Sequence, residues 1–308
     1  MKDDPGEASV IAALTDSVTL PDWVRHGPGD DAAILDDGQV LTTDLLVEGV
    51  HFDHRIGPEQ LAWKLVAVNA SDVASCGARS TWALLSIALP NPIDSEWLNR
   101  FSGALKHHLS ELGIALIGGD TTRSPHTKVI NLCLSGTLES APLLRSTAGP
   151  DEDIWVSGTL GDASAGFHQR SPELEERWHC PQPPLDLGPA LAKESLASSA
   201  MDLSDGLLQD LRRLCKASGV GAEIDPERLP TSSALRDLGE PLLSHQLGFG
   251  EDYQLLFTAH PSDASQVLAL GETLGVQLTR IGKTTSNLDL VLPGADAVEV
   301  WTHFRGDP

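Results

Sequence analysis

The sequence predicts an α/β (α+β) protein of two domains. Its 308 residues exceed the roughly 100–200 residues of an average domain. Strand-like and helix-like stretches alternate along the first half, which is typical of a mixed sheet packed against helices. A break that contains two prolines, a glycine and three acidic residues lies at 141–153. We therefore expect one domain over residues 1–145 and a second over 146–308.

Hydrophobic periodicity and stop signals give the elements of the first domain. Four stretches are expected to form strands, at 40–43, 80–89, 114–117 (short and buried) and 129–138. Two stretches are expected to form helices, at 59–76 and 95–112. Gly113 ends the second helix, because glycine readily adopts the left-handed conformation of a helix C-terminus.

The second domain has weaker signals. Strands are expected at 154–157, 255–258 and 288–292. A helix is expected at 207–218, where leucines recur on one side and Gly219 follows the last turn. The stretch 170–189 holds five prolines and matches no period, so we expect a loop that serves as a lid, a linker or a surface excursion.

The charge of the chain excludes several classes of partner. There are 21 Lys and Arg residues against 44 Asp and Glu residues, which gives a formal net charge of −23. Binding to nucleic acid needs a basic face that displaces counterions from phosphates, and docking on anionic lipid needs basic residues as well. We therefore expect neither nucleic acid nor a membrane among the partners.

The remaining composition favours a cytoplasmic protein. No apolar run reaches the ~18–20 residues of a membrane span, and the first residues lack the basic-then-apolar pattern of a signal peptide. The four cysteines, Cys76, Cys133, Cys180 and Cys215, show no C-x-x-C spacing. A zinc knuckle or a redox dithiol is therefore not expected, and a reducing compartment fits best.

Several carboxylates stand beside short apolar runs, whereas acidic residues on a solvated surface sit among polar neighbours. They are Asp30, Asp31, Asp44, Asp120, Asp202 and Asp205. For any one of them, a turn or a helix cap is an alternative explanation. As a set they offer the oxygen ligands that hard divalent ions such as Mg²⁺ bind, often together with substrate phosphates.

Asp72 departs most clearly from a surface pattern. Leu65, Val68 and Asp72 are spaced three and four residues apart on the expected helix at 59–76, which places the carboxylate on the apolar face. A buried carboxylate must be neutralised, paired or bound to a metal. Lys64 is assigned to another face and Arg79 lies beyond the helix end, so a bound cation is the favoured explanation.

Two segments are candidates for binding phosphate. The segment 201–206 (Met-Asp-Leu-Ser-Asp-Gly) opens the helix at 207–218, and backbone N–H groups at a helix N-terminus attract anions. A simple N-cap by Ser204 or Asp205 is the alternative. The Gly- and Ser-rich turn at 158–166 is a second, weaker candidate. No Walker A motif, G-x-G-x-x-G or G-x-S-x-G is found.

Nearly the whole chain resembles the thiamine-monophosphate kinases, a family of the aminoimidazole ribonucleotide synthetase superfamily. The resemblance rests on the segments 29–33 (Gly-Asp-Asp-Ala-Ala), 42–52 (Thr-Thr-Asp-Leu-Leu-Val-Glu-Gly-Val-His-Phe), 67–74 (Ala-Val-Asn-Ala-Ser-Asp-Val-Ala), 118–121 (Gly-Gly-Asp-Thr), 158–162 (Gly-Thr-Leu-Gly-Asp), 201–207 (Met-Asp-Leu-Ser-Asp-Gly-Leu), 250–253 (Gly-Glu-Asp-Tyr) and 301–304 (Trp-Thr-His-Phe). Segments 47–52 and 251–253 are more specific to the kinases than to their relatives. Phe249 stands where the family has a glycine.

The resemblance implies a function, a fold and a set of site residues. It implies ATP-dependent phosphorylation of thiamine monophosphate to thiamine diphosphate, with Asp44, Asp72 and Asp120 as the catalytic carboxylates. The implied ligands of several Mg²⁺ ions are Asp31, Thr43, Asp44, Asp72, Asp120, Asp202 and Asp205. The implied ATP contacts are Gly119, Asp120, Arg145 and Ser204, and the implied contacts to thiamine monophosphate are His51, Glu251 and Trp301. It also implies a two-domain fold whose N-terminal mixed sheet forms a homodimer and whose site lies between the domains.

Simple chemistry agrees with the implied reaction, and two alternatives remain. The attacking phosphate oxygen is already anionic, so the site must offset charge repulsion rather than supply a general base. Another ATP-dependent enzyme such as aminoimidazole ribonucleotide synthetase is the first alternative, and segment 47–52 argues against it. A non-catalytic protein that binds divalent ions or nucleotide is the second. It explains the acidity but does not explain Asp72 on an apolar helix face.

Overall fold

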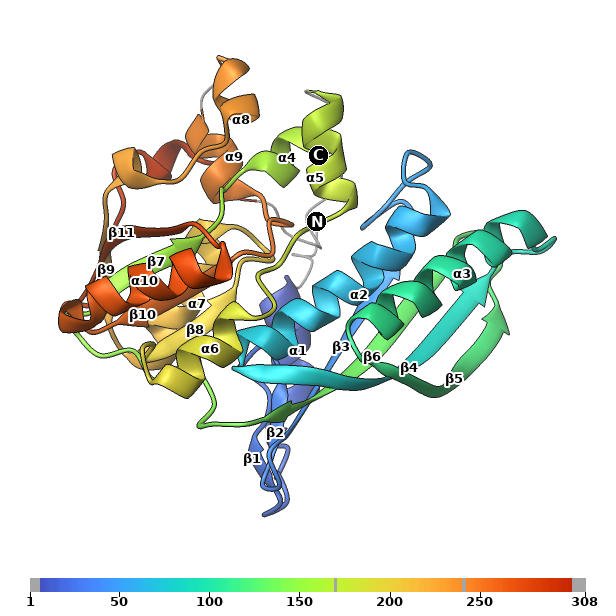
Figure 1. Ribbon diagram of the computed structural model, residues 1–308, viewed down its shortest axis with the longest axis horizontal. Helices are drawn as coiled ribbons and strands as arrows, with labels where there is room; N and C mark the ends of the chain where they lie inside the picture. Colours follow the sequence, from blue (N-terminus) through green and yellow to red (C-terminus); the bar gives the residue numbers. More distant parts are fainter. Residues whose placement is uncertain (1–5, 169–170, 240–241, 301–308) are drawn as a thin grey trace.

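The computed structural model describes residues 6–168, 171–239 and 242–300. Within these ranges the strands form two six-stranded sheets, which lie side by side with helices packed on them (Figure 1). This mixed α/β architecture is the predicted fold class, and each sheet belongs to one half of the chain. The helix that starts at Pro58 lies between the two halves.

The first sheet is mixed and is covered by helices on one face. Its strands, in spatial order, are β1 (Val24–His26), β2 (Ala33–Leu35), β3 (Gln39–Val47), β6 (Val129–Leu138), β4 (Ala78–Leu89) and β5 (Ala115–Arg123). Only β4 and β5 run parallel. Helices α2 (Pro58–Ser75) and α3 (Ser95–Glu111) pack on each other, and α2 contacts β3, β4 and β6.

Alternation along β3 decides which of its side chains reach the site. Val40 and Leu46 are buried, whereas Leu45 is 51% exposed. Successive side chains of a strand point to opposite faces. Thr42 and Asp44 therefore share the covered face with Val40 and Leu46, beneath α2. Thr43 and Leu45 lie on the other face.

The second sheet is covered on both faces. Its strands, in spatial order, are β12 (Leu290–Val291), β9 (Gly221–Ile224), β11 (Leu278–Thr285), β7 (Asp153–Ser157), β10 (Leu255–Ala259) and β8 (Ser199–Asp202). Strands β7 and β10 and the edge strand β8 are buried at every residue. One cluster contains Met201 and Leu256 with α7 (Leu207–Ser218), and another contains Ala200 and Phe257 with α6 (Leu187–Glu194) and α10 (Ala264–Leu274).

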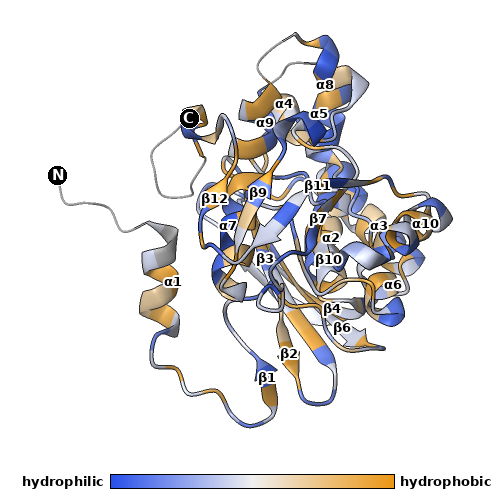
Figure 2. Cartoon of the chain, turned by 90° about the vertical axis from the view of Figure 1, so that its left-hand side faces the viewer, coloured by the Kyte–Doolittle hydropathy of each residue, from blue (hydrophilic) through white to orange (hydrophobic). Residues whose placement is uncertain are grey.

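The remaining helices are short. They are α1 (Glu7–Thr15), α4 (Asp162–Phe167), α5 (Pro172–His179), α8 (Ser233–Asp237), α9 (Leu242–Gly248) and the 3₁₀ turns η1 (Pro226–Arg228), η2 (Pro261–Asp263) and η3 (Ala295–Ala297). Helix α1 stands away from the body of the molecule (Figure 2), with Ile11 50% and Leu14 74% exposed. In the described part of the chain, no helix is long and apolar enough to cross a membrane.

Two expectations about the elements were wrong. The stretch 170–189 contains α5 and the start of α6 rather than only a loop. Its Pro172 and Pro189 stand in first turns, where a missing N–H is tolerated, and Ser171 caps α5 by accepting a hydrogen bond from the Leu174 N–H at 3.2 Å. The strand expected at 114–117 spans Ala115–Arg123 and is exposed throughout, because it lies at the edge of its sheet.

Candidate active site

The candidate site is a cavity of about 210 Å³ between the two halves of the chain. The first half contributes Asp44, Leu45, Leu46, Val50 and His51, and the second contributes Phe167, Trp178, Ser204, Asp205, Phe249, Gly250, Glu251 and Tyr253. Helix α2 passes beside it and contacts β3 on one side and β8 on the other. The cavity therefore brings together residues that are as far apart in the sequence as Asp44 and Tyr253.

Three carboxylates form a compact cluster near this cavity. Carboxylate oxygens of Asp31, Asp72 and Asp202 all lie within 4.8 Å of one another. Asp31 precedes β2, Asp72 lies in the last turn of α2, and Asp202 ends β8. The cluster is thus built from both halves of the chain, and its members are the carboxylates that the sequence placed beside apolar runs.

Hydroxyl groups hold the cluster in place. Thr42 Oγ1 donates to Asp72 Oδ2 at 2.6 Å, and Ser71 Oγ donates to Asp202 Oδ2 at 2.6 Å. Ser75 Oγ donates to Asp31. These bonds satisfy some of the carboxylate lone pairs, and they leave the charges to be offset in another way.

The electrostatics of the cluster favour a cation. Burial, together with the charges of neighbouring carboxylates, raises the pKa of Asp72 and of Asp202 well above the usual range. Burial and the charges of Glu251 and Asp205 raise the pKa of Asp44 to about 6. Hard oxygen donors at this spacing suit Mg²⁺, so Asp31, Asp72 and Asp202 can hold such an ion.

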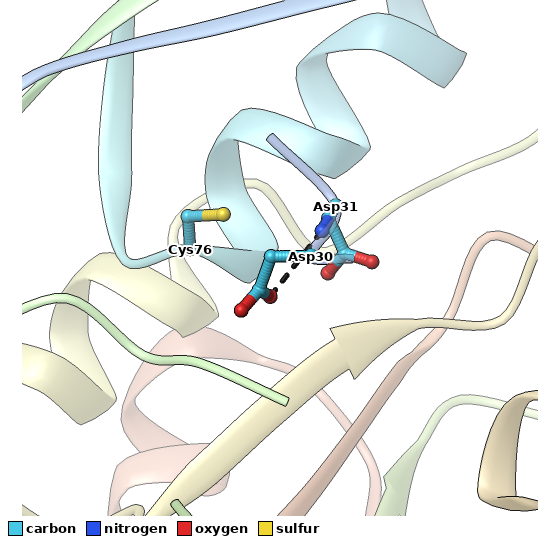
Figure 3. A group of neighbouring side chains, drawn as sticks. All are labelled: Asp30, Asp31 and Cys76. Atoms are coloured by element: carbon cyan, nitrogen blue, oxygen red, sulfur yellow. Dashed lines mark hydrogen bonds between the residues drawn. The ribbon is translucent and has the colours of Figure 1, made fainter. Parts of the chain in front are cut away.

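Asp30 and Cys76 lie beside Asp31 of the cluster (Figure 3). Asp30 accepts hydrogen bonds from the Arg145 N–H at 3.2 and 3.3 Å and from the Asp31 N–H at 3.3 Å. Burial, reinforced by the charges of Asp31, Asp30 and Asp72, raises the pKa of the Cys76 thiol well above its ordinary value. Sulfur is a soft ligand and Mg²⁺ prefers oxygen, so Cys76 does not extend the proposed metal site.

The turn before α7 forms the edge of the cavity. The Asp205 N–H donates to Asp210 Oδ2 at 3.0 Å, and Arg213 forms ion pairs with Asp205 and Asp210. Gly250 packs so closely on this turn that a Cβ there would lie 1.7 Å from the Ser204 carbonyl oxygen. This packing leaves Ser204 and Asp205 facing the cavity at the N-terminus of a twelve-residue helix, where an anion is stabilised.

Lys64 is a site residue that the sequence did not single out. Expected on a face of its helix away from Asp72, it is fully buried and forms an ion pair with Glu251 of the cavity wall. Its Nζ also donates to the Trp178 carbonyl oxygen at 3.0 Å and lies 4.8 Å from the centre of the Trp178 ring. A lysine in the middle of an otherwise buried helix was the available signal, because such a charge needs a partner.

Four further residues were predicted to contact the substrates. His51 and Glu251 line the cavity, and His51 Nδ1 accepts a hydrogen bond from the Val47 N–H at 3.1 Å. Arg145 is paired with Asp31, with Nε–Oδ1 at 2.9 Å, rather than left as an exposed loop residue. Trp301 lies outside the described residues.

Three residues that the resemblance implies as metal ligands or ATP contacts lie away from the carboxylate cluster of the same chain. They are Thr43, Gly119 and Asp120. The Thr43 side chain lies on the opposite face of β3, where its Oγ1 accepts a hydrogen bond from Asn131 Nδ2 at 2.7 Å. Gly119 and Asp120 lie on the exposed edge strand β5. Strands β4 and β6 separate β5 from β3, a distance of about 14 Å for three strand spacings.

Comparison with known proteins points to one family. Residues 29–138 match "AIR synthase related protein, N-terminal domain", and residues 149–292 match "AIR synthase related protein, C-terminal domain". The chain is 40% identical to the thiamine-monophosphate kinase of Escherichia coli K12, over 98% of this chain and 97% of that protein. It is 33% identical to the thiamine-monophosphate kinase of Aquifex aeolicus, over 90% and 92% of the two chains.

Solved structures agree with the sequence comparison. The structure titled "AaThiL complexed with AMPPCP and TMP" superposes with a TM-score of 0.83 at 31% identity and covers 97% of each chain. Thiamine-monophosphate kinase from Stenotrophomonas maltophilia superposes with a TM-score of 0.78 at 34% identity, over 92% of this chain and 94% of that one.

Proposed function

This chain belongs to the AIR synthase related family and, within it, to the thiamine-monophosphate kinases, and from that premise we propose how its site works. The enzyme transfers a phosphoryl group from ATP to thiamine monophosphate and forms thiamine diphosphate. The observation that carries the mechanism is the cluster of Asp31, Asp72 and Asp202, which is built from both halves of the chain near the cavity.

We propose that Asp31, Asp44, Asp72, Asp202 and Asp205 hold several Mg²⁺ ions. These residues fit Mg²⁺ because they offer carboxylate oxygens, which are the ligands that the ion prefers. The two basic side chains described near the cluster of Asp31, Asp72 and Asp202 pair with only one of its carboxylates. Arg145 pairs with Asp31, and Lys64 pairs with Glu251. When bound, Mg²⁺ would screen the charges of the two phosphate groups. The rest of the mechanism belongs to the residues of the chain.

These residues bind and orient the two substrates. Ser204 and the backbone N–H groups at the start of α7 bind phosphate oxygens. Arg145, whose planar guanidinium suits phosphate, is held beside them by Asp30 and Asp31. His51, Glu251 and Trp301 bind thiamine monophosphate. No residue needs to remove a proton, since the acceptor phosphate is anionic, so positioning and charge carry the catalysis.

Removal of divalent ions is expected to abolish the reaction. With ATP and Mg²⁺, the enzyme should form thiamine diphosphate in an amount that depends on added thiamine monophosphate, as followed by chromatography. EDTA should stop product formation, and excess Mg²⁺ should restore it, because without cations the carboxylates repel both phosphate groups. Undiminished turnover in EDTA would contradict the metal assignment and leave the reaction itself intact.

We further propose that the enzyme is a homodimer formed through its first sheet. Strand β5 is exposed at all nine residues, including Leu116 (41%) and Ile117 (59%), and Leu45 is exposed on the uncovered face. An exposed apolar edge strand is a liability in a monomer and is usually covered. A second copy would cover it, and Gly119 and Asp120 would then act in a site shared between the two chains.

A charge on this edge is expected to separate the subunits. Ile117→Lys should give a monomer by light scattering after gel filtration, because the ammonium group would be buried without a partner. Turnover should fall with the dimer if Gly119 and Asp120 act across the interface. Leu268→Lys is the matched control, because Leu268 on α10 is 47% exposed and lies outside the first sheet. An Ile117→Lys variant that stays dimeric would exclude this edge as the interface.

Two further assignments complete the proposal. We place the domain boundary near residue 145, in the segment that joins β6 to β7. We also propose a cytoplasmic location, where the four cysteines stay reduced, since all four are free and lie within the described residues.

A further inference from the structure

An aromatic pair forms part of the cavity wall. Phe167, at the end of α4, and Phe249, just after α9, both line the cavity and are partly exposed to it. Their ring centres are 5.0 Å apart and the rings are tilted by 26°, so they stack on each other. Neither residue belongs to the site residues implied by the family resemblance.

The pair is supported from beneath. Phe167 packs edge-on against Trp178, with ring centres 5.4 Å apart, and Trp178 is only 2% exposed. Arg55 lies 4.6 Å from the centre of the Trp178 ring, and its Nη1 donates to the Phe167 carbonyl oxygen at 3.2 Å. The wall is therefore held rigid by a buried indole and a fixed guanidinium, as a preformed binding surface requires.

The cavity lining includes both polar and apolar side chains. Asp44, Ser204 and Asp205 are the polar residues assigned to phosphate, whereas Phe167, Phe249 and Val50 are apolar. Thiamine monophosphate has the same division, with a phosphate at one end and two flat heteroaromatic rings at the other. Seating the phosphate toward the carboxylates leaves the rings for the apolar wall.

We propose that the stacked pair Phe167 and Phe249 binds a ring of thiamine monophosphate and sets the preference of this enzyme for an acceptor with a flat heteroaromatic ring. The inference rests on the proposed function and assigns the ring-binding residues of the same site. Aromatic faces bind electron-poor and cationic rings well, and the thiazolium ring is cationic. Glu251 lines the same cavity, and Lys64 offsets its charge there.

The test measures binding of each substrate alone, by calorimetry, to the full-length enzyme and to two variants. Phe249→Leu and Phe167→Leu keep an apolar side chain and remove the flat surface. Each should weaken the binding of thiamine monophosphate by roughly tenfold, the size of one lost stacking contact. Binding of a non-hydrolysable ATP analogue should be unchanged. Thiamine, which has the rings without the phosphate, should lose affinity by the same factor, whereas inorganic diphosphate should not.

Controls keep the outcomes distinct. Trp97→Leu removes one ring of a stacked pair on α3, whose centres are 5.0 Å apart, and should leave all four affinities unchanged. A selective loss for the ATP analogue would assign the wall to adenine and overturn the proposal. Unchanged binding of thiamine monophosphate by both folded variants would also overturn it. Failure of the wild-type enzyme to bind thiamine monophosphate would instead refute the proposed function.

Discussion

Asp72→Asn is expected to abolish turnover and to leave the fold intact. Asp72 lies at the centre of the carboxylate cluster, with Asp31 and Asp202 oxygens within 4.8 Å. Asparagine keeps the shape and can still accept the hydrogen bond from Thr42 Oγ1, but it removes a charge that a divalent ion requires. A cation contributes several kcal/mol to the stability of the transition state, so kcat should fall by about 10³-fold.

The same substitution is expected to stabilise the protein when no divalent ions are present. Burial and the charges of Asp44, Asp202 and Asp31 raise the pKa of Asp72 in the folded state. A carboxyl group whose folded pKa lies above its unfolded pKa costs stability as the pH rises through that range. Asparagine avoids this cost, so at pH 8 in EDTA the variant should unfold at a temperature no lower than the wild type.

The melting temperatures of the wild type and of Asp72→Asn should also be measured with added Mg²⁺. The melting temperature of the wild type should rise with Mg²⁺ concentration, because a ligand that binds only the folded state stabilises it. The variant should show a smaller rise. Asp186→Asn is the control, since the Asp186 side chain is 68% exposed and pairs with exposed Arg79. Normal turnover by Asp72→Asn would remove Asp72 from the metal site.

Lys64→Met is expected to damage both stability and acceptor binding. The lysine is fully buried and neutralises Glu251, which shares the cavity with Asp44 and Asp205. Removing one partner of a buried ion pair leaves the other charge without compensation and typically costs about 3 kcal/mol. The KM for thiamine monophosphate should rise by about 10–100-fold, since Glu251 loses the group that fixes its position. The KM for ATP should change little.

A second substitution distinguishes the effect of the unpaired Glu251 charge from the effect of losing the Lys64 side chain. In the double variant Lys64→Met, Glu251→Gln, the buried negative charge is gone, so the free energy of unfolding should recover part of the loss. The matched control is Lys128→Met, because Lys128 also pairs with a glutamate (Nζ–Oε1 2.7 Å) and lies 5.5 Å from a tryptophan ring, but its side chain is 25% exposed and lies outside the cavity lining. Equal effects of Lys64→Met and Lys128→Met on KM would contradict a role for Lys64 in the site.

The parts of the site that could be predicted have local signals. Asp72 stood out because three residues at helical spacing placed a carboxylate among apolar neighbours. Asp202 and Asp205 stood out because they open a helix. The fold class followed from periodicity. In the first half, α2, α3, β4 and β6 were found close to their true bounds, whereas β3 and β5 are longer than expected and α1, β1 and β2 were not expected.

The parts that could not be predicted depend on distant contacts. The pairing of Lys64 with Glu251 joins residues that are 187 positions apart, and no pattern along the chain connects them. Strand β5 has an apolar start that reads as buried, although its place at the sheet edge leaves it exposed. Thr43 and Thr42 are adjacent in sequence, and only the face of β3 that meets α2 decides which of them reaches Asp72.

The origin of the cluster in both halves of the chain makes cation binding and domain geometry reciprocal. Asp31 and Asp72 belong to the half of the chain that holds the first sheet, and Asp202 belongs to the half that holds the second. An ion that binds all three carboxylates favours the arrangement in which the two halves are close. By thermodynamic linkage, any change that separates the halves lowers the affinity for that ion. The cavity is also lined from both halves. We therefore expect acceptor and cation to act on one shared equilibrium, so that each raises the affinity of the enzyme for the other.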